Sequence, residues 1–465
     1  MDADVSGNND RRRVDGDGTT AGTTAGPAGA AAGATPGATP GTTPGTTAGA
    51  PAAATAATTG APAAGDAAGA GSVAAFTRDW LHRNRDTLTG WRRHLHRNPE
   101  LSHREEGTTA FIVDTLTAAG LDPHRLPGTG VTVDIGEGDG PVLAFRGDID
   151  ALPLDEVTGL DYASRVPGVM HACGHDIHTT VVLGLACALA EYRREHPLPL
   201  RVRCIFQPAE EVMGGGATDV IAAGALAGVG HIFALHCEPK LRTGEIGLRT
   251  GAITSAADVV EVVLTGPGGH TSRPHLTADL VYAAGALITQ LPALLSRTVD
   301  PRTGTVLTFG AVNGGSAFNA VPREVRLLGT LRTGDVRVWR TAEETFTALV
   351  ERIVAPTGAR VEVRYTKGVP PVMNDDVATS VLARAAEGVD PHGVREAPQS
   401  SGGEDFSWYT ERVPGSMARL GSWTGVGEKP DLHQPDIVFD EGCIPVGVAL
   451  FAGVVDHFHP GSPGM

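Results

Sequence analysis

The chain has 465 residues, of which 41% are hydrophobic, and a formal net charge of −16 at pH 7. So acidic a chain has no basic face to neutralise phosphates, which argues against a nucleic-acid partner. Its five cysteines are odd in number and irregularly spaced, which favours a reducing compartment over a disulfide framework. No apolar run reaches the ~18 residues of a membrane helix, and no export signal is evident. We therefore expect a cytoplasmic protein without a membrane partner.

The first 71 residues are dominated by Ala, Gly, Thr and Pro. Such a segment has few bulky side chains to bury and cannot offset the entropy of ordering, so we predict a disordered tail over 1–71. From Val73 the composition changes. Apolar residues recur at helical spacing until a break at Pro99, which predicts an amphipathic helix.

Short apolar runs then alternate with a helical pattern. The segments "PVLAFRGDIDALP" (141–153), "LRVRCIFQPAEE" (200–211) and "HIFALHCEP" (231–239) predict strands, and "TTVVLGLACALAEYRREH" (179–196) predicts a helix. This order indicates an α/β domain with a mixed or parallel sheet covered by helices. Polar residues follow the apolar core of each strand, and we expect them to converge because open α/β sheets bind ligands at the carboxyl ends of their strands. They are Asp148, Asp150, Glu210, Glu211 and His236.

Residues 253–365 have a different pattern, with strands and helices in the order β-α-β-β-α-β. This is the split ferredoxin-like arrangement. We therefore predict an inserted α+β domain over 253–365, and a main domain formed by 72–252 together with 366–465.

The segment "HACGHDIH" (171–178) places one cysteine and three histidines within eight positions. These donors suit zinc or a similar divalent ion, but the spacing is not that of a zinc finger, so further ligands must come from distant segments. A cysteine thiolate can bridge two ions, and two ions about 3.5–4 Å apart can hold a hydroxide and polarise a carbonyl. The candidate ligands are Cys173, His175, Glu211, His236 and His433.

Glu210 and Glu211 are adjacent carboxylates that follow a buried strand and a proline. Facing a cleft, one of the two could bind a metal while its neighbour acts as the general base on the water between the ions. A plainer interpretation of such a pair is a solvated surface charge.

Nine motifs in chain order resemble the M20 metallopeptidase family. They are "LHRNPELSHREE", "FRGDIDALP", "HACGHDIH", "QPAEE", "LH" at 235–236, "GGHTSRPH", "FNAVP", "GTLRT" and "GGEDF". The match is to the amidohydrolase branch, which includes hydrolases of N-acyl, hippuryl and indole-acetyl amino acids. The resemblance implies a zinc-exopeptidase-type catalytic domain interrupted by a ferredoxin-like dimerisation domain, and hence a homodimer through residues 253–365.

The resemblance also implies roles for individual residues. Cys173 would bridge two divalent ions (Zn, Mn, Co or Ni), with His175, Glu211, His236 and His433 as the other ligands. Glu210 takes the general-base position, and Asp150 falls where the family keeps an acidic residue that orients rather than binds the metal. His270 resembles a residue that reaches into the partner subunit's site and stabilises the oxyanion. Asn319 and Arg332 resemble residues that hold the substrate's carboxylate.

Some assignments stay open. His275 could exchange roles with His270, and His171 and His178 are either supporting donors or packed residues. Val212 and Met213 stand where the resemblance leads us to expect glycines.

The favoured activity is hydrolysis of N-acyl amino acids. A dipeptidase or carboxypeptidase of the same fold is the nearest alternative, and a non-catalytic metal-binding or ligand-binding protein is an alternative of another class. The sequence has no G-x-S-x-G, H-E-x-x-H or P-loop motif, which argues against the enzymes that those motifs mark.

Overall fold

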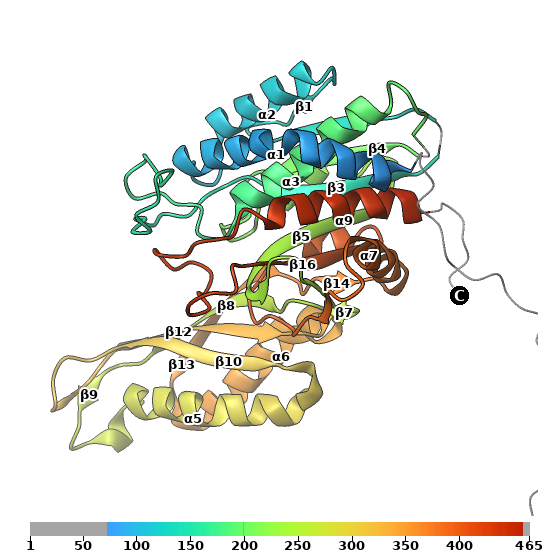
Figure 1. Cartoon of the computed structure of the whole chain (residues 1–465). Helices are drawn as coiled ribbons and strands as arrows, with labels where there is room; N and C mark the ends of the chain where they lie inside the picture. The colour runs from blue at the N-terminus through green and yellow to red at the C-terminus, as the bar shows by residue number, and fades with distance from the viewer. Residues whose placement is uncertain (1–71, 139, 199, 459–465) are drawn as a thin grey trace, which may run out of the picture. The chain divides into compact units, whose positions relative to one another are not determined.

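The computed structural model describes residues 72–138, 140–198 and 200–458 (Figure 1), so the predicted N-terminal tail lies outside the described residues. A large mixed sheet forms the centre of the main domain. Its eight strands lie in the order β1-β2-β4-β3-β5-β16-β6-β15. Their bounds are β1 His124–Arg125, β2 Val131–Ile135, β3 Val142–Asp148, β4 Val202–Gln207, β5 Val229–Arg242, β6 Ile246–Leu248, β15 Val394–Glu396 and β16 Gly415–Trp423. The four central strands β4, β3, β5 and β16 run parallel, which confirms the predicted mixed α/β sheet.

Helices cover both faces of this sheet because alternate residues of its strands point to opposite sides. Leu143 and Phe145 of β3 pack into the core under one group of helices, and Val142 and Ala144 pack into the core on the other face. The first group is α1 (Val73–Arg97), α2 (Glu106–Ala118), α3 (His175–Tyr192), α7 (Asp376–Val389) and α9 (Cys443–His457); the second is α4 (Ala217–Ala222) and α8 (Ser407–Thr410).

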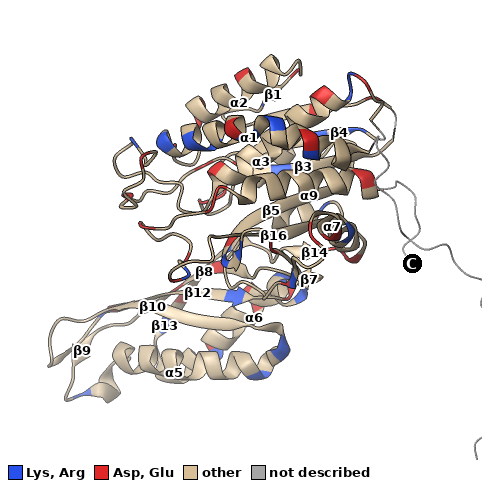
Figure 2. Cartoon of the chain, in the orientation of Figure 1, with Lys and Arg blue, Asp and Glu red and all other residues tan. Residues whose placement is uncertain are grey.

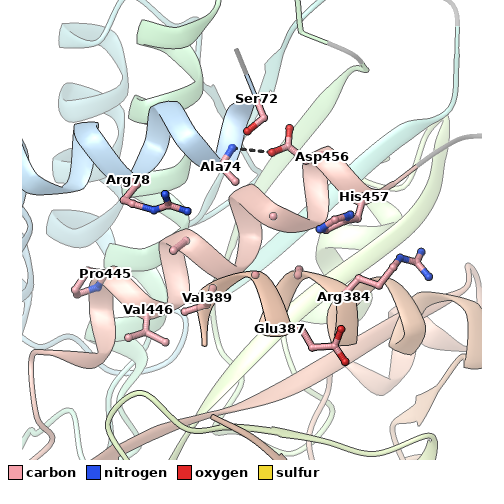
Figure 3. A pocket seen from close by; sticks show the side chains of 14 residues that line it. Ser72, Ala74, Arg78, Arg384, Glu387, Val389, Pro445, Val446, Asp456 and His457 are labelled. Atoms are coloured by element: carbon pink, nitrogen blue, oxygen red, sulfur yellow. Dashed lines mark hydrogen bonds between the residues drawn. The ribbon is translucent and has the colours of Figure 1, made fainter. Parts of the chain in front are cut away.

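The start of α1 is fixed by its caps. The Ser72 hydroxyl accepts a hydrogen bond from the Ala75 amide at 3.1 Å, and Asp456 near the end of α9 accepts from the Val73 and Ala74 amides at 2.9 and 2.8 Å. These bonds satisfy amides that have no partner inside the helix. A cavity of about 660 Å³ lies beside these caps between α1, α7 and α9 (Figure 3). Within the described residues, no group of metal-ligating side chains lies there.

A second sheet carries the elements predicted for residues 253–365. It is antiparallel, with the order β10-β12-β8-β13. Along the chain the elements are β8 (Ala256–Thr265), α5 (Leu280–Thr298), β10 (Val306–Asn313), β12 (Glu324–Thr333), α6 (Val336–Val354) and β13 (Arg360–Val369). This is the predicted β-α-β-β-α-β order. The sheet and its two helices enclose a hydrophobic core of their own, which includes Leu264, Leu287, Leu327 and Phe346.

Short elements complete the fold. Two small two-stranded ladders pair β7 (Gly251–Ala252) with β14 (Met373–Asn374) and β9 (Gly269–His270) with β11 (Ala320–Val321). The 3₁₀ turns are η1 (Pro274–Leu276), η2 (Pro301–Thr303) and η3 (Ala355–Thr357).

Helix α5 is long and apolar enough, by length and composition alone, to cross a membrane. Its inner face explains part of that apolarity, because Ala283, Leu287 and Leu291 are buried in the core of the second sheet. Core helices of soluble domains pass the same test, so α5 carries no argument for a membrane span. Val281 and Tyr282 on its outer face are exposed.

Two predicted boundaries were wrong. Strand β5 continues to Arg242 rather than ending at Pro239, because β16 pairs along it from Ile232 to Glu238, so His236 lies well inside the strand rather than just past its apolar core. Helix α3 begins at His175 rather than Thr179. Gly174, with φ of 89°, turns the chain directly into the helix, and glycine adopts this left-handed conformation without steric penalty.

Candidate metal centre and active site

Separate segments bring the five predicted metal ligands together. Cys173 lies just before α3 and His175 begins it, Glu211 follows β4, His236 lies on β5 and His433 lies in the loop before α9. The ligand atoms of Cys173, His175 and His236 lie within 4.8 Å of one another, and so do those of Cys173, Glu211 and His433. Because Cys173 belongs to both groups, the arrangement offers two adjacent positions for metal ions that share its sulfur.

The distances inside the cluster fit metal coordination. Cys173 Sγ lies 3.4 Å from His236 Nε2, and Glu211 Oε1 lies 3.4 Å from His433 Nε2 and 3.8 Å from His175 Nε2. Ligand atoms about 2.0–2.3 Å from one tetrahedral ion are ~3.3–3.8 Å apart. His175 Nε2 and Glu211 Oε1 are also buried without a hydrogen-bond partner among the described residues. Buried polar atoms are rarely left unpaired, and a cation between these two would satisfy both.

Hydrogen bonds on the far side of each ring orient the histidine ligands. His175 Nδ1 lies 3.0 Å from the Asp150 carbonyl oxygen and 3.2 Å from its carboxylate, and His236 Nδ1 lies 2.8 Å from the Cys237 carbonyl oxygen. Because Nδ1–H donates there, the Nε2 lone pair faces the cluster. Asp150 also accepts from the Glu211 amide at 3.0 Å. It therefore holds two ligands in place, which supports the orienting role expected for it.

The charges around the cluster favour a cation. Burial, and then the charge of Arg419, lower the pKa of His236, which keeps that ring neutral. Burial alone would lower the pKa of His175, but Asp148 and Cys173 raise it well above its usual value. Burial and then Glu211 raise the pKa of the Cys173 thiol. Cys173 and His175 thus hold protons where a divalent ion would compete for the same positions.

Glu210 lies beside the cluster, with Oε2 at 3.9 Å from His175 Nε2. It also approaches Glu404 and Asp405 so closely that one oxygen from each of the three carboxylates lies within 4.8 Å of the others. Burial, and then Glu404 and Glu211, raise the pKa of Glu210 well above its usual value. A carboxyl group of this kind can take up a proton and return it near neutral pH.

A buried arginine supports these carboxylates from behind. Arg146 donates to Gln207 Oε1 at 2.8 Å, to Asp405 Oδ1 at 2.7 Å and to Asp148. Burial, which outweighs the opposing charge of Arg146, and then Glu404 raise the pKa of Asp405 to about 7. The sequence contained these residues in "FRGDIDALP" and "GGEDF" without indicating their roles. An arginine inside an otherwise apolar strand was the signal that could have found them, because such a charge needs buried partners.

Strained backbone accompanies the site. Ala209 directly precedes Glu210 and has φ of 56°, and His433 has φ of 63°. These left-handed conformations are unfavourable for residues other than glycine and persist where surrounding contacts enforce them. The Ala209 amide donates to Glu105 Oε1 at 2.8 Å, and its carbonyl oxygen accepts from the Gly216 amide at 2.7 Å. The turn that presents Glu210 is therefore fixed from both sides.

Gly174 lies between two of the ligands and should tolerate no side chain. A Cβ atom there would lie 2.9 Å from Cys237 Sγ, at φ of +89°. We expect Gly174→Ala to lower the free energy of unfolding by about 2–3 kcal/mol and to weaken metal binding. The control is Gly90→Ala in the exposed interior of α1, where nothing lies within 4 Å of the added atom; it should gain about 0.5–1 kcal/mol. Urea unfolding measures both, and equal effects would contradict the expected clash.

Two histidines of the "HACGHDIH" segment have supporting or unexplained places. His178 Nδ1 lies 2.6 Å from Asp148 Oδ1, and its Nε2 accepts from the Cys237 amide at 2.8 Å. His178 therefore ties β3 to β5 beneath the ligands. Both ring nitrogens of His171 are buried without a hydrogen-bond partner among the described residues, and we have no physical account of this.

The predicted substrate-binding residues fall into two places. Arg332 on β12 lines a cavity of about 470 Å³ that opens beside the metal ligands, and its Nη1 donates to the Ser401 carbonyl oxygen at 2.7 Å. His270 lies on the β9–β11 ladder and Asn319 directly precedes β11, where the Thr271 amide donates to the Asn319 carbonyl oxygen at 3.2 Å. Neither lines that cavity. His275 is exposed in the nearby turn η1.

Known proteins resemble this chain over most of its described length. The sequence pattern of peptidase family M20/M25/M40 matches residues 144–457. An N-acetyl-L-cysteine deacetylase of Bacillus subtilis is 42% identical over 360 residues, covering 77% of this chain and 84% of that protein. A Rhodococcus jostii protein named as a glutamate–cysteine ligase is 51% identical over 363 residues, or 78% of this chain, but the match spans only 45% of that protein's length.

A solved structure agrees with these relatives. A Bacillus subtilis protein described as a dinuclear metal-binding peptidase of the M20 family has 36% identity and a TM-score of 0.71, and the match covers 81% of this chain and 98% of that one. Together with the family pattern, this likeness supports a metal-dependent hydrolase of the amidohydrolase branch and confirms the resemblance recognised in the motifs. The chain belongs to peptidase family M20/M25/M40.

Proposed function

We propose that this protein is a metal-dependent amidohydrolase that cleaves N-acyl amino acids to a carboxylic acid and a free amino acid. The observation that carries this proposal is the pair of ligand groups that share Cys173, with the carboxyl group of Glu210 beside them. The likeness to an N-acetyl-L-cysteine deacetylase supports the class of substrate.

Cys173, His175, Glu211, His236 and His433 would hold two divalent ions. Sulfur, nitrogen and oxygen donors in this combination suit Zn, Mn, Co or Ni. Bound ions would supply Lewis-acid polarisation of the substrate's carbonyl group.

Proton transfer, positioning and substrate binding fall to other residues of the chain. Glu210 takes a proton from the attacking water and delivers it to the leaving nitrogen, while Asp150 keeps His175 in position. Arg332, which faces the cavity from the second sheet, pairs with the substrate's α-carboxylate. His270 stabilises the oxyanion and Asn319 contacts the substrate, both acting from the partner subunit of a homodimer.

The second sheet offers a surface for that homodimer. Strand β10 is an edge strand and α5 packs over it. Large apolar side chains are exposed on both elements, and we call this surface the α5–β10 face; it comprises Val281, Tyr282, Ile288 and Leu294 of α5 and Val312 of β10. Clustered exposed apolar residues beside an open strand edge mark interaction sites.

A charge on the α5–β10 face should separate the subunits. We expect Ile288→Glu to halve the mass measured by light scattering, because an ionised carboxylate cannot be buried unpaired in an interface. The matched control is Val377→Glu on α7, where Val377 is similarly exposed outside this face; its mass should equal that of the unaltered protein. A dimeric Ile288→Glu variant would show that the subunits associate elsewhere.

All five cysteines are unpaired. Free thiols are typical of reducing compartments, which supports our expectation of a cytoplasmic enzyme.

The substrate class is tested by a panel. Protein stripped of metal by a chelator and restored separately with Zn, Mn, Co and Ni is assayed on N-acetyl, N-benzoyl and indole-acetyl amino acids and on dipeptides. We expect hydrolysis of at least one N-acyl series, lost on chelation and recovered with metal. Faster cleavage of dipeptides would favour the dipeptidase alternative. Metal uptake without cleavage of any amide would favour a binding protein.

A further inference from the structure

Arg419 has no assigned role, and it lies at the metal site. It is on the central strand β16, and in the parallel pairing of β16 with β5 it stands opposite His236. Neighbouring residues in register point to the same side of a sheet. Arg419 accordingly lines the same cavity as Cys173, His236 and Arg332.

The Arg419 guanidinium group is buried and unpaired. Only 6% of the residue is exposed, yet no hydrogen bond or ion pair to its side chain occurs among the described residues. The charges of Glu238 and Glu404 act on it through space, but neither forms an ion pair with it. In contrast, buried Arg146 has carboxylate partners at Asp148, Glu404 and Asp405.

An unpaired buried cation is unfavourable, and this one stands beside a metal ligand. Burying a charge without a partner is strongly disfavoured, and two divalent ions at the neighbouring ligands would add repulsion. An anion in the cavity would remove both penalties. A carboxylate suits the planar guanidinium best because it accepts two parallel hydrogen bonds.

Every N-acyl amino acid carries at least its α-carboxylate, and Arg332 is available for that group. Arg332 is half-buried and lies on the second sheet, whereas Arg419 lies on the main sheet next to His236. Two guanidinium groups from different domains therefore face one cavity, and a substrate with a single carboxylate would leave one of them unpaired.

We infer that Arg419 binds a second carboxylate of the substrate, and that the enzyme prefers N-acyl amino acids with two acidic groups. This inference rests on the proposed function. The second carboxylate belongs either to a dicarboxylic acyl group or to an acidic amino-acid side chain; the chemistry at Arg419 is the same for both.

The experiment compares three substrates with one metal-restored enzyme: N-acetyl-leucine, N-acetyl-glutamate and N-succinyl-leucine. For the unaltered protein, we expect kcat/KM to be higher by about 10- to 100-fold for one of the two diacids, which identifies the source of the carboxylate. Arg419→Met should abolish that preference through KM and change N-acetyl-leucine by less than about threefold. Arg419→Lys should keep part of the preference, because it keeps the charge but loses the fork geometry.

The melting temperature of the variants distinguishes this binding role of Arg419 from a structural one. Removing an unpaired buried charge should raise the melting temperature of Arg419→Met by a few degrees, about 2–4 °C, whereas loss of a structural arginine would lower it. Arg412→Met, at an exposed arginine shortly before the same strand, is the control and should change neither property.

Three results would overturn the inference. They are equal kcat/KM values of the unaltered enzyme for all three substrates, an equal loss of all three in Arg419→Met, and a lower melting temperature of that variant. Calorimetric binding of succinate, glutamate and acetate to the metal-restored protein tests Arg419 without turnover. If no N-acyl amino acid is cleaved, the proposed function fails. An Arg419-dependent preference for succinate or glutamate over acetate would still support a carboxylate site, and its absence would reject one.

Discussion

Replacing Glu210 with glutamine should reduce kcat by about 10²- to 10⁴-fold while both metal ions stay bound. The amide keeps the shape of the side chain but cannot take a proton from water or return one to the leaving nitrogen. Glu210 is held by the strained turn at Ala209, and its carboxyl group faces Glu404 and Asp405. Steady-state assays of substrate hydrolysis give kcat, and elemental analysis of the dialysed protein gives the metal content.

The neighbouring residue provides the control for this prediction. Glu211→Gln changes the same functional group one position along, but Glu211 Oε1 lies among the metal ligands. We expect this variant to lose metal, whereas Glu210→Gln does not. Near-normal turnover by Glu210→Gln would remove Glu210 from the mechanism, and loss of metal from that variant would make it a ligand instead of a base.

The predicted ligands lie close together in the structure, and they could be selected from the sequence because they lie in short, distinctive motifs. Local patterns also fixed the order of elements in the second sheet, where strands alternate regularly, as in β8 with alternate residues buried. The five predicted ligands could be grouped into one site because the carboxyl ends of parallel strands lie in one region of the sheet.

Features that depend on pairing between segments far apart in the sequence could not be predicted. Strand β16 is buried along almost its whole length, and its sequence "GSMARLGSW" shows no alternation because both faces are covered. Because this pairing was not recognised, the predicted strand ended at Pro239 instead of Arg242, and nothing indicated that Arg419 stands opposite His236. Likewise, the partners of Arg146 lie up to 259 residues away, and spacing along the chain could not reveal them.

Charged residues are common on the helices of the main domain and sparse on α5 and β10, and this difference bears on how two subunits could associate. Figure 2 shows acidic and basic residues scattered over the helices of the main domain, while much of α5 and β10 carries neither. The absence of charge along α5 and β10 coincides with the apolar α5–β10 face. Association through this face would carry the β9–β11 ladder, with His270 and Asn319, along with each subunit's second sheet.

A dimer formed through the α5–β10 face leads to a second prediction with a large effect, at His270. His270→Ala should reduce kcat by about 10²- to 10³-fold, as expected for loss of a group that stabilises an oxyanion. His270 is exposed, and its side chain hydrogen-bonds only to Ser272 among the described residues, so its removal should leave stability unchanged. His275→Ala, in the same segment, tests whether the two histidines exchange roles.

Mixed dimers test whether His270 acts across the interface. When His270→Ala and Glu210→Gln proteins are unfolded together and refolded, half of the dimers are mixed, and one of their two sites combines Glu210 with the partner's intact His270. Activity should therefore recover to about one quarter of the unaltered level. Glu210→Gln mixed with Glu211→Gln is the control and should recover nothing, because both residues serve their own subunit's site. If neither mixture recovers activity, His270 acts in the site of its own chain. Closure of the second sheet over the cavity would then have to bring it there.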